Sequence, residues 1–203
     1  MDRVEALQQL ELLVGQDLHL LAREHRVEIA GPSGRVNKGW AGHVIERYLG
    51  LPTNSAQSPN FGSWELKVIP LKKDRAGRLQ IKETMAITMI DPVEVGSTPF
   101  EDSHLCRKLK KAVIVARTVG SSVYEPSFVH SVSALDLGGK VLAQVKRDYV
   151  EIQDCINDAA RGFAALSGAM GTYIQPRTKG AGHGSTSRAF YARKIFLQEF
   201  VQI

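Results

Sequence analysis

The spacing of apolar residues predicts three helices. Leucine and valine side chains recur at steps of three and four residues across residues 2–26, which predicts an N-terminal helix with Asp2 as its cap. The same spacing is found over about residues 38–49 and residues 146–166. Each helix would place one apolar face against a core.

Other stretches alternate between apolar and polar residues, as strands do. Trp64, Leu66 and Val68 fall on one side of an extended segment that Pro70 closes. Residues 79–90 and the apolar run 112–116 predict two further strands. Helices and strands mixed along one chain indicate an α/β protein.

The other side of the first strand carries charge instead of apolar groups. Glu65 and Lys67 are two residues apart, so their side chains point the same way about 7 Å apart. A carboxylate and a neighbouring backbone carbonyl can bind Mg²⁺, while an ammonium can orient water or neutralise a phosphate. Glu-x-Lys on a solvated strand face is nevertheless common, so this pair alone favours an ordinary surface.

Composition narrows the class of protein. The chain has 203 residues, a net charge of +5 and a pI of about 9.3, which suits a polyanionic partner. No apolar run approaches the roughly 20 residues that span a bilayer, and residues 1–5 lack a secretory pattern, so we expect a cytoplasmic protein without a membrane anchor. Cys106 and Cys155 have no metal-ligand spacing and are expected to be buried free thiols.

Four motifs in order resemble the MutH branch of the PD-(D/E)xK nuclease superfamily. They span most of the chain and comprise Asn37 to Gly42 with Glu46, Trp64 to Pro70, Ser103 to Lys111, and Arg188 to Lys194. The resemblance implies an α/β restriction-endonuclease-like fold, with a central mixed sheet, flanking helices and two lobes around a DNA cleft. Residues 1–203 would form one endonuclease domain, with catalysis mainly in 30–120 and DNA recognition mainly in 146–203.

The resemblance also implies roles for individual residues. The expected catalytic residues are Glu46, Asn60, Glu65, Lys67 and Lys108, and the expected Mg²⁺ ligands are Asn60, Glu65 and the backbone carbonyl of Leu66. The expected DNA contacts are Lys38, Arg107, Lys110, Lys111, Arg177, Lys179, Arg188 and Tyr191. Glycines in residues 180–187 would let the backbone approach DNA closely, although such a loop is more often a linker.

Two positions depart from the MutH-like pattern. Asn60 stands where the family has an aspartate that binds metal, and its spacing to Glu65 is two residues shorter. An amide oxygen can bind Mg²⁺ but brings no negative charge, so either the site is weakened or it tolerates asparagine. Ala86 stands where the family has a phenylalanine that touches DNA, which leaves methylation sensing open.

These observations predict a Mg²⁺-dependent, sequence-specific endonuclease that acts on double-stranded DNA, at GATC-like sites and as a monomer. A restriction enzyme would cut both strands, whereas a mismatch-repair nickase would act on hemimethylated sites with MutL as partner. Another class of function is a DNA-binding module with a degenerate nuclease site. A basic globular protein without a DNA role ranks last.

Overall fold

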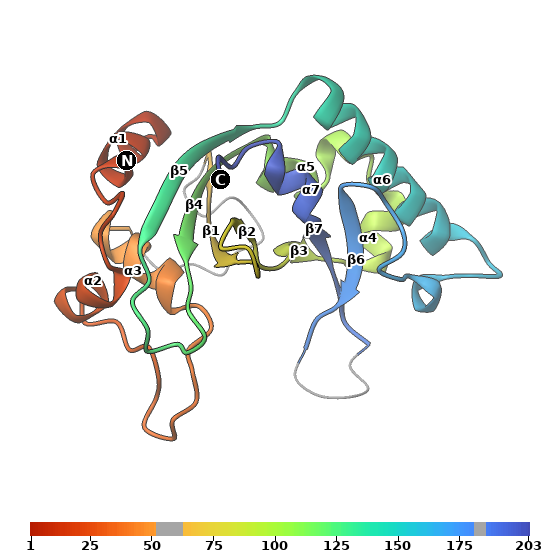
Figure 1. Ribbon diagram of the computed structural model, residues 1–203. Coiled ribbons are helices and arrows are strands. Elements are labelled where there is room, and N and C mark those ends of the chain that lie inside the picture. Colours follow the sequence, from red (N-terminus) through yellow and green to blue (C-terminus); the bar gives the residue numbers. More distant parts are fainter. Residues whose placement is uncertain (52–62, 181–185) are drawn as a thin grey trace.

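The computed structural model describes residues 1–51, 63–180 and 186–203. Its helices and strands follow one another along the chain (Figure 1) as α1 (Arg3–Glu11), α2 (Leu18–Glu24), α3 (Trp40–Tyr48), β1 (Glu65–Lys73), β2 (Leu79–Ile81), β3 (Met85–Met89), α4 (Pro92–Ser97), the 3₁₀ turn η1 (Phe100–Asp102), α5 (His104–Lys110), β4 (Lys111–Thr118), β5 (Val129–Asp136), α6 (Gly139–Asn157), the 3₁₀ turn η2 (Phe163–Ala165), β6 (Ile174–Thr178), β7 (Arg188–Ala192) and α7 (Lys194–Gln198).

The strands form two sheets. The larger sheet has the order β2-β1-β4-β5; β1 and β4 run parallel, and the other two pairs are antiparallel. The smaller sheet is antiparallel, with the order β3-β7-β6. The predicted α/β class, with a mixed sheet and flanking helices, is therefore confirmed, and a second sheet accompanies the central one.

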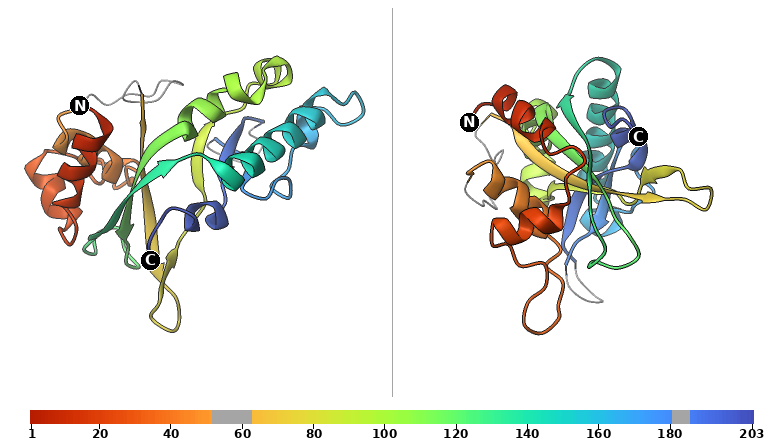
Figure 2. Two further views of the ribbon diagram at one scale, coloured as in Figure 1. Left: turned by 90° about the horizontal axis from the view of Figure 1, so that it is seen from above. Right: turned by 60° about the vertical axis from the view of Figure 1, so that its left-hand side comes forward.

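Apolar side chains cover both faces of the larger sheet. Trp64 and Leu66 belong to a core formed with the three N-terminal helices, while Ile69 and Leu71 belong to a core shared with the smaller sheet and α6. Figures 1 and 2 show α1 to α3 on one side of the strands and α6 on the other. The alternation predicted for β1 is thus observed, and its second face turns apolar beyond Lys67.

Half of β1 lies at an edge of the described sheets. β4 pairs with β1 from Glu65 to Leu71, but on the other side β2 pairs only with residues Leu71 to Lys73. In the first half of β1, no described strand covers the side away from β4. The residues that carry the predicted chemistry therefore lie where a substrate can approach the strand.

The predicted N-terminal helix over 2–26 is wrong in one respect, because the segment folds as two helices. Asp2 does cap α1 by accepting a hydrogen bond from the Glu5 amide at 2.9 Å. The helix ends at Glu11, and Gly15 takes a positive φ of 83° while its amide donates to the Val129 carbonyl at 2.8 Å. A left-handed residue cannot continue a helix, so α2 starts anew at Leu18.

Two further element boundaries also need correction. Residues 79–90 form β2 and β3 in different sheets, because the chain leaves the first sheet at Lys82. The helix predicted over 146–166 is α6, which starts at Gly139 and ends at Asn157, before the left-handed Gly162. Cys106 and Cys155 are free thiols as predicted, but only Cys155 is buried, whereas Cys106 is half-buried on α5. Among the described residues, no helix combines the length and apolarity needed to cross a membrane.

Candidate active site and DNA-binding cleft

Glu65 is the centre of a buried cluster of charges at the start of β1. Its side chain is only 1% exposed, and its Oε1 lies 2.8 Å from Lys67 Nζ and 3.2 Å from Lys108 Nζ. Lys67 is on the same face of the strand two residues later, as the alternation predicted. Burying a carboxylate is costly unless cations or donors compensate it, and two lysines do so here.

Lys108 reaches Glu65 from a different element. Helix α5 begins after Ser103, whose hydroxyl accepts a hydrogen bond from the Cys106 amide at 3.1 Å, and Lys108 lies on the face turned toward β1. Burial lowers the pKa of the Lys108 ammonium, and the charge of Glu65 partly offsets that effect. The charges of Lys67 and Lys179 lower it further. Lys108 is thus poised to give up a proton more easily than an exposed lysine.

Glu46 supplies a second carboxylate near the cluster. It lies in α3, whose side chains Trp40, Val44 and Ile45 pack into the N-terminal core. Burial raises the pKa of the Glu46 carboxyl, and the charge of Glu65 adds to this, whereas His43 and Lys67 lower it. Its Oε2 is buried with no hydrogen-bond partner. A buried carboxylate oxygen without a hydrogen-bond donor is suited to binding a cation.

The residues present fit a divalent cation in chemical type. Pro70 accepts a hydrogen bond from the Lys82 amide, on the side of β1 away from β4. Because carbonyls alternate along a strand, the Leu66 carbonyl points to that same side. Glu46, Glu65 and this carbonyl are the oxygen ligands that Mg²⁺ prefers. In the parts of the chain described, no group of three or more histidine, cysteine or acidic residues is gathered, and Asn60 lies outside them.

A cleft leads from the cluster to the smaller sheet. A pocket of about 440 Å³ is lined by Lys67 of β1, by Ala86 of β3 and by Arg177 and Tyr191 of β6 and β7. Arg177 Nη1 donates to Thr84 Oγ1 at 2.8 Å, and its guanidinium carbon lies 5.5 Å from the centre of the Tyr191 ring. Ala86 is the cross-strand partner of Tyr191. The structure therefore gathers three residues that the sequence linked to DNA.

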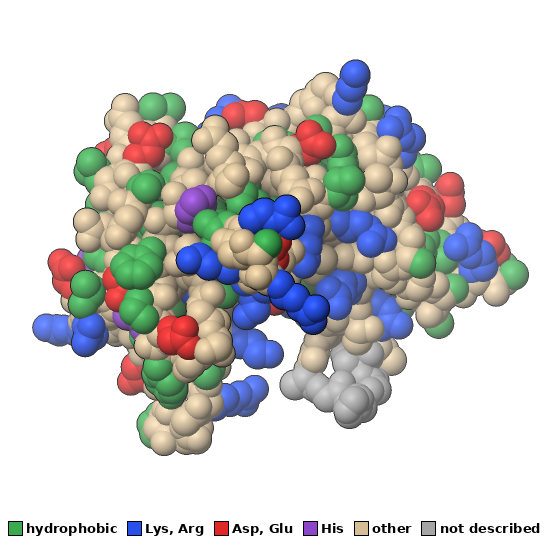
Figure 3. All heavy atoms as spheres, viewed as in Figure 1, with side chains coloured by type: hydrophobic (Ala, Val, Ile, Leu, Met, Phe, Trp, Pro, Cys, Tyr) green, Lys and Arg blue, Asp and Glu red, His purple; other side chains and the backbone are tan. Residues whose placement is uncertain are grey.

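Positive charge surrounds this cleft. Figure 3 shows Lys and Arg side chains lining the hollow between the two halves of the molecule. Lys179, at the end of β6, is near enough to Lys108 for its charge to lower the pKa of that lysine. Lys38 is exposed on the N-terminal side and lines a pocket of about 660 Å³ together with Gly180. The two halves thus present cations to one shared space.

Four predicted DNA contacts are less directly linked to the cluster. Arg107 is exposed, and its guanidinium donates to the Asp102 carbonyl at 2.5 Å and pairs with the His104 ring at 2.9 Å. Lys110 is exposed at the end of α5, and Lys111 pairs in register with Asp136 on β5. Arg188 is half-buried at the start of β7 and donates to the Thr186 carbonyl at 3.3 Å. Their contact with DNA remains a prediction.

The sequence reading missed three residues of the cleft region. Lys82 and Glu83 follow β2, and Glu83 lines both the pocket beside Lys67 and a second pocket next to Lys38. Arg117, near the end of β4, lines that second pocket. Arg117 directly follows the apolar run 112–116 while still in β4, which is a weak signal that could have singled it out. Lys82 and Glu83 lie in an ordinary charged turn, and no pattern marks them.

Comparisons with known proteins show which proteins this chain is similar to. The family model "DNA mismatch repair enzyme MutH" matches residues 49–124. DNA mismatch repair protein MutH of Shewanella woodyi is 27% identical, with 93% of this chain and 86% of that protein aligned. The MutH proteins of Pasteurella multocida and Haemophilus ducreyi are 24% and 26% identical, each across 98% of this chain and 94% of theirs. A solved complex of restriction endonuclease MvaI with cognate DNA is similar over 91% of this chain and 96% of that chain, at 12% identity and a TM-score of 0.38.

Proposed function

Because the chain is a MutH-like nuclease of the PD-(D/E)xK class, we propose that it hydrolyses phosphodiester bonds in double-stranded DNA at specific, GATC-like sequences with Mg²⁺ as cofactor. The observation that carries this proposal is the buried Glu65 carboxylate with Lys67 and Lys108 on the same oxygen. Burying three charged groups costs free energy of folding, so a cluster of this kind is expected where it has a catalytic role.

Each residue of the cluster has a proposed role. Asn60, Glu65 and the Leu66 carbonyl would hold Mg²⁺, with Glu46 beside them. When bound, the ion supplies charge stabilisation at the scissile phosphate and lowers the pKa of water. Lys67 would position the attacking water, and Lys108 would neutralise charge that develops on the phosphate. The products would carry a 3′-hydroxyl and a 5′-phosphate.

Residues 1–203 would form one domain. Residues 146–203 would mainly recognise the DNA sequence, and residues 30–120 would mainly carry out catalysis. Arg177 is held by Thr84 and by the Tyr191 ring, so its remaining donors are oriented before DNA arrives. An arginine can read a guanine edge with two hydrogen bonds. Tyr191 pairs across the strands with Ala86 of β3 and with Gln175 of β6, and we propose that the small Ala86 side chain leaves room for a base or its methyl group.

The identity of residue 60 would affect the rate of DNA cleavage. An asparagine brings no charge to the metal, so we propose that it weakens metal binding and water activation relative to an aspartate. A chain that binds DNA but does not cut it would be the second candidate function. The sequence at position 60 favours that candidate, whereas the intact Glu65 cluster favours turnover.

The biological setting also belongs to the proposal. The similar MutH proteins are named for mismatch repair, which would make this chain a nickase with MutL as partner and a monomer in its free form. A restriction enzyme would instead cut both strands without MutL. Assays of nicking and linearisation with and without added MutL distinguish the two.

Cleavage of supercoiled plasmid tests the proposal directly. The wild-type chain and Asn60→Asp are each incubated with a GATC-containing plasmid and with a GATC-free plasmid, in Mg²⁺ and in chelator. We expect metal-dependent nicked or linear product on the GATC plasmid, with the faster rate in Asn60→Asp. If neither protein cuts in any metal while both bind DNA, the catalytic assignment falls and the binding-module function replaces it.

A further inference from the structure

Arg117 is a partly buried cation without an acidic partner. Its Nη1 donates to Ser127 Oγ at 2.8 Å, and its guanidinium carbon lies 5.0 Å from the centre of the Trp40 ring. Among the residues that the structure describes, it forms no ion pair with a carboxylate. Burial lowers the pKa of the Arg117 guanidinium, and the more distant charge of Glu83 offsets only part of that effect. Such a guanidinium has donors to spare for an anion.

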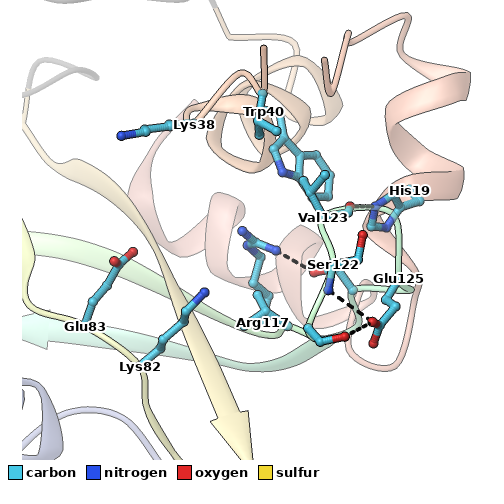
Figure 4. A pocket seen from close by; sticks show the side chains of 14 residues that line it. His19, Lys38, Trp40, Lys82, Glu83, Arg117, Ser122, Val123 and Glu125 are labelled. Atoms are coloured by element: carbon cyan, nitrogen blue, oxygen red, sulfur yellow. Dashed lines mark hydrogen bonds between the residues drawn. The ribbon is translucent and has the colours of Figure 1, made fainter. Parts of the chain in front are cut away.

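The local fold directs Arg117 into a cavity. β4 keeps its regular alternation through Arg117, because the register shift between β4 and β5 falls on β5, where His130 is skipped. Arg117 then lies on the sheet face that carries Val113 and Val115, toward Trp40 of α3. The result is a pocket of about 360 Å³ between the N-terminal helices and the β4–β5 connection (Figure 4).

A network of hydrogen bonds fixes the pocket wall. The Ser127 hydroxyl donates to the Thr118 carbonyl at 2.8 Å, and the Ser127 amide donates to Asp17 Oδ1 at 3.0 Å. Asp17 also accepts from the His19 amide at 3.0 Å, and His19 Nε2 lies 2.7 Å from the Val123 carbonyl. Two segments that are far apart in the sequence, residues 17–19 and 118–127, are thereby tied together beside Arg117.

The pocket opens toward the cleft. Figure 4 shows Lys38, Lys82 and Glu83 on one side of it and His19 and Glu125 on the other. Glu83 also lines the pocket beside Lys67, so the two cavities adjoin. The Glu125 carboxylate is already engaged by the Ser122 amide at 3.0 Å and by the Ser121 hydroxyl. Three cations, Arg117, Lys38 and Lys82, therefore line the pocket with two carboxylates, Glu83 and the already hydrogen-bonded Glu125.

We propose that this pocket binds a phosphate group of the DNA backbone, at a position away from the scissile bond, through the guanidinium of Arg117 with Lys38 and Lys82 at its mouth. The inference rests on the proposed function, because it assigns the phosphate to a DNA substrate. The fixed wall holds the guanidinium in place before DNA arrives, so little side-chain freedom is lost on binding. A contact of this type adds affinity without reading sequence.

The salt dependence of DNA binding tests the proposal. Binding of a GATC duplex and of a scrambled duplex is measured in chelator over a range of salt concentrations, for wild type, Arg117→Gln and Lys140→Gln. Lys140→Gln is the charge-matched control, because Lys140 is exposed and belongs to α6, which lies on the other side of the strands from α1 to α3 (Figure 1). We expect Arg117→Gln to bind both duplexes about tenfold more weakly and to reduce the salt slope by about one, while the control matches wild type.

A thermal melting curve shows whether Arg117→Gln folds. If it does not, two more variants still test the proposal. Lys82→Gln, at an exposed position, is expected to weaken both duplexes about threefold. Arg117→Lys keeps the charge and is expected to retain the salt slope while losing part of the affinity. Wild-type affinity and slope in Lys82→Gln, or in a folded Arg117→Gln, overturn the proposal.

The remaining outcomes identify the source of the phosphate. If Arg117→Gln weakens only the GATC duplex, the side chain reads a base and the backbone assignment is overturned. If inorganic phosphate shifts wild-type tryptophan fluorescence while DNA affinity is insensitive to Arg117, the pocket takes free phosphate instead. If wild type binds no duplex at all, the proposed function fails first, and that result is distinct from a defect confined to the variants.

Discussion

Two acidic side chains, Glu65 and Asp148, are equally buried at 1% exposure, yet they are compensated in opposite ways. Asp148 accepts hydrogen bonds from the backbone amides of residues 172, 173 and 174 at 2.9, 2.6 and 2.7 Å. Gln144 adds a further donor at 2.7 Å. Glu65 lies instead against two lysine side chains. Backbone amides are fixed by the fold, whereas lysine side chains can swing away.

The difference separates a structural carboxylate from the one that we propose to be catalytic. Asp148 holds the entry to β6 against α6, and its donors would be left without an acceptor if it were removed. The lysines beside Glu65 can turn to a phosphate while the carboxylate turns to a cation. Equal burial therefore says little about function, and the identity of the compensating groups says much more.

The largest expected effect comes from Glu65→Gln. We expect DNA cleavage to fall about a thousandfold or more, since charge stabilisation by a bound metal is worth several kcal/mol. The protein should remain folded, because Lys67 is partly exposed and Lys108 can release its proton more easily than an exposed lysine. Plasmid cleavage under single-turnover conditions measures the loss. Cleavage within tenfold of wild type would remove Glu65 from the catalytic centre.

Asp148→Ala should mainly reduce stability, whereas Glu65→Gln should mainly reduce cleavage. Three backbone amides lose their acceptor, so we expect the free energy of unfolding to drop by about 3 kcal/mol or more. Urea denaturation measures this, with Asp148→Asn as the matched variant that retains one acceptor oxygen and should lose less. If Asp148→Ala is as stable as wild type, the contrast between fixed and exchangeable partners is not the right explanation.

Lys108→Met tests whether Lys108 acts in catalysis or only in DNA binding. We expect the cleavage rate at saturating DNA to fall about a hundredfold, because a cation at the developing phosphate charge is lost. DNA affinity should change little. Arg107→Met, the neighbouring position on the same helix, should instead weaken affinity and leave the saturated rate intact. Equal effects of both variants on the saturated rate would contradict a special role for Lys108.

The smallest expected change in stability comes from removing the Asp17 carboxylate. Like Asp148, Asp17 accepts hydrogen bonds mainly from backbone amides. Burial opposes its ionisation, but backbone hydrogen bonds from His19 and Ser127 outweigh this and lower its pKa below the usual 3.8. A lowered carboxyl pKa stabilises the fold above pH 3.8, and this contribution is lost as the pH falls through the folded pKa. Asp17→Ala should therefore cost about 1 kcal/mol at pH 7. Unfolding curves of wild type and variant should converge in acid; a constant gap would contradict the charge argument.

The sequence contained the local part of the site but not its assembly. Alternation along one strand was enough to place Glu65 and Lys67 on a common face, because a strand repeats every two residues. Lys108 and Glu46 approach Glu65 from two helices far away in the chain, and only the resemblance to MutH linked them to it beforehand. Periodicity carries no information about which helix packs against which strand end.

The errors of the sequence reading also have physical causes. The apolar spacing of residues 2–26 continues through Gly15, so nothing in the pattern shows that this glycine takes a left-handed conformation to reach Val129. Residues 79–90 look like one strand because both sheets bury the same kinds of side chain. Arg117 escaped notice since its significance depends on a cavity built by three distant segments.

The edge of β1 that no described strand covers has a consequence for solubility. A strand whose backbone groups lack a neighbour is a template on which another chain can add a strand and start aggregation. Here the edge carries Lys67, whose ammonium pairs with Glu65, and ends near Pro70; a charged residue and a proline on an edge both discourage such pairing. The residues proposed for catalysis would then also keep copies of the protein apart. Removing the charge of Lys67 should increase self-association at high concentration as well as slow cleavage.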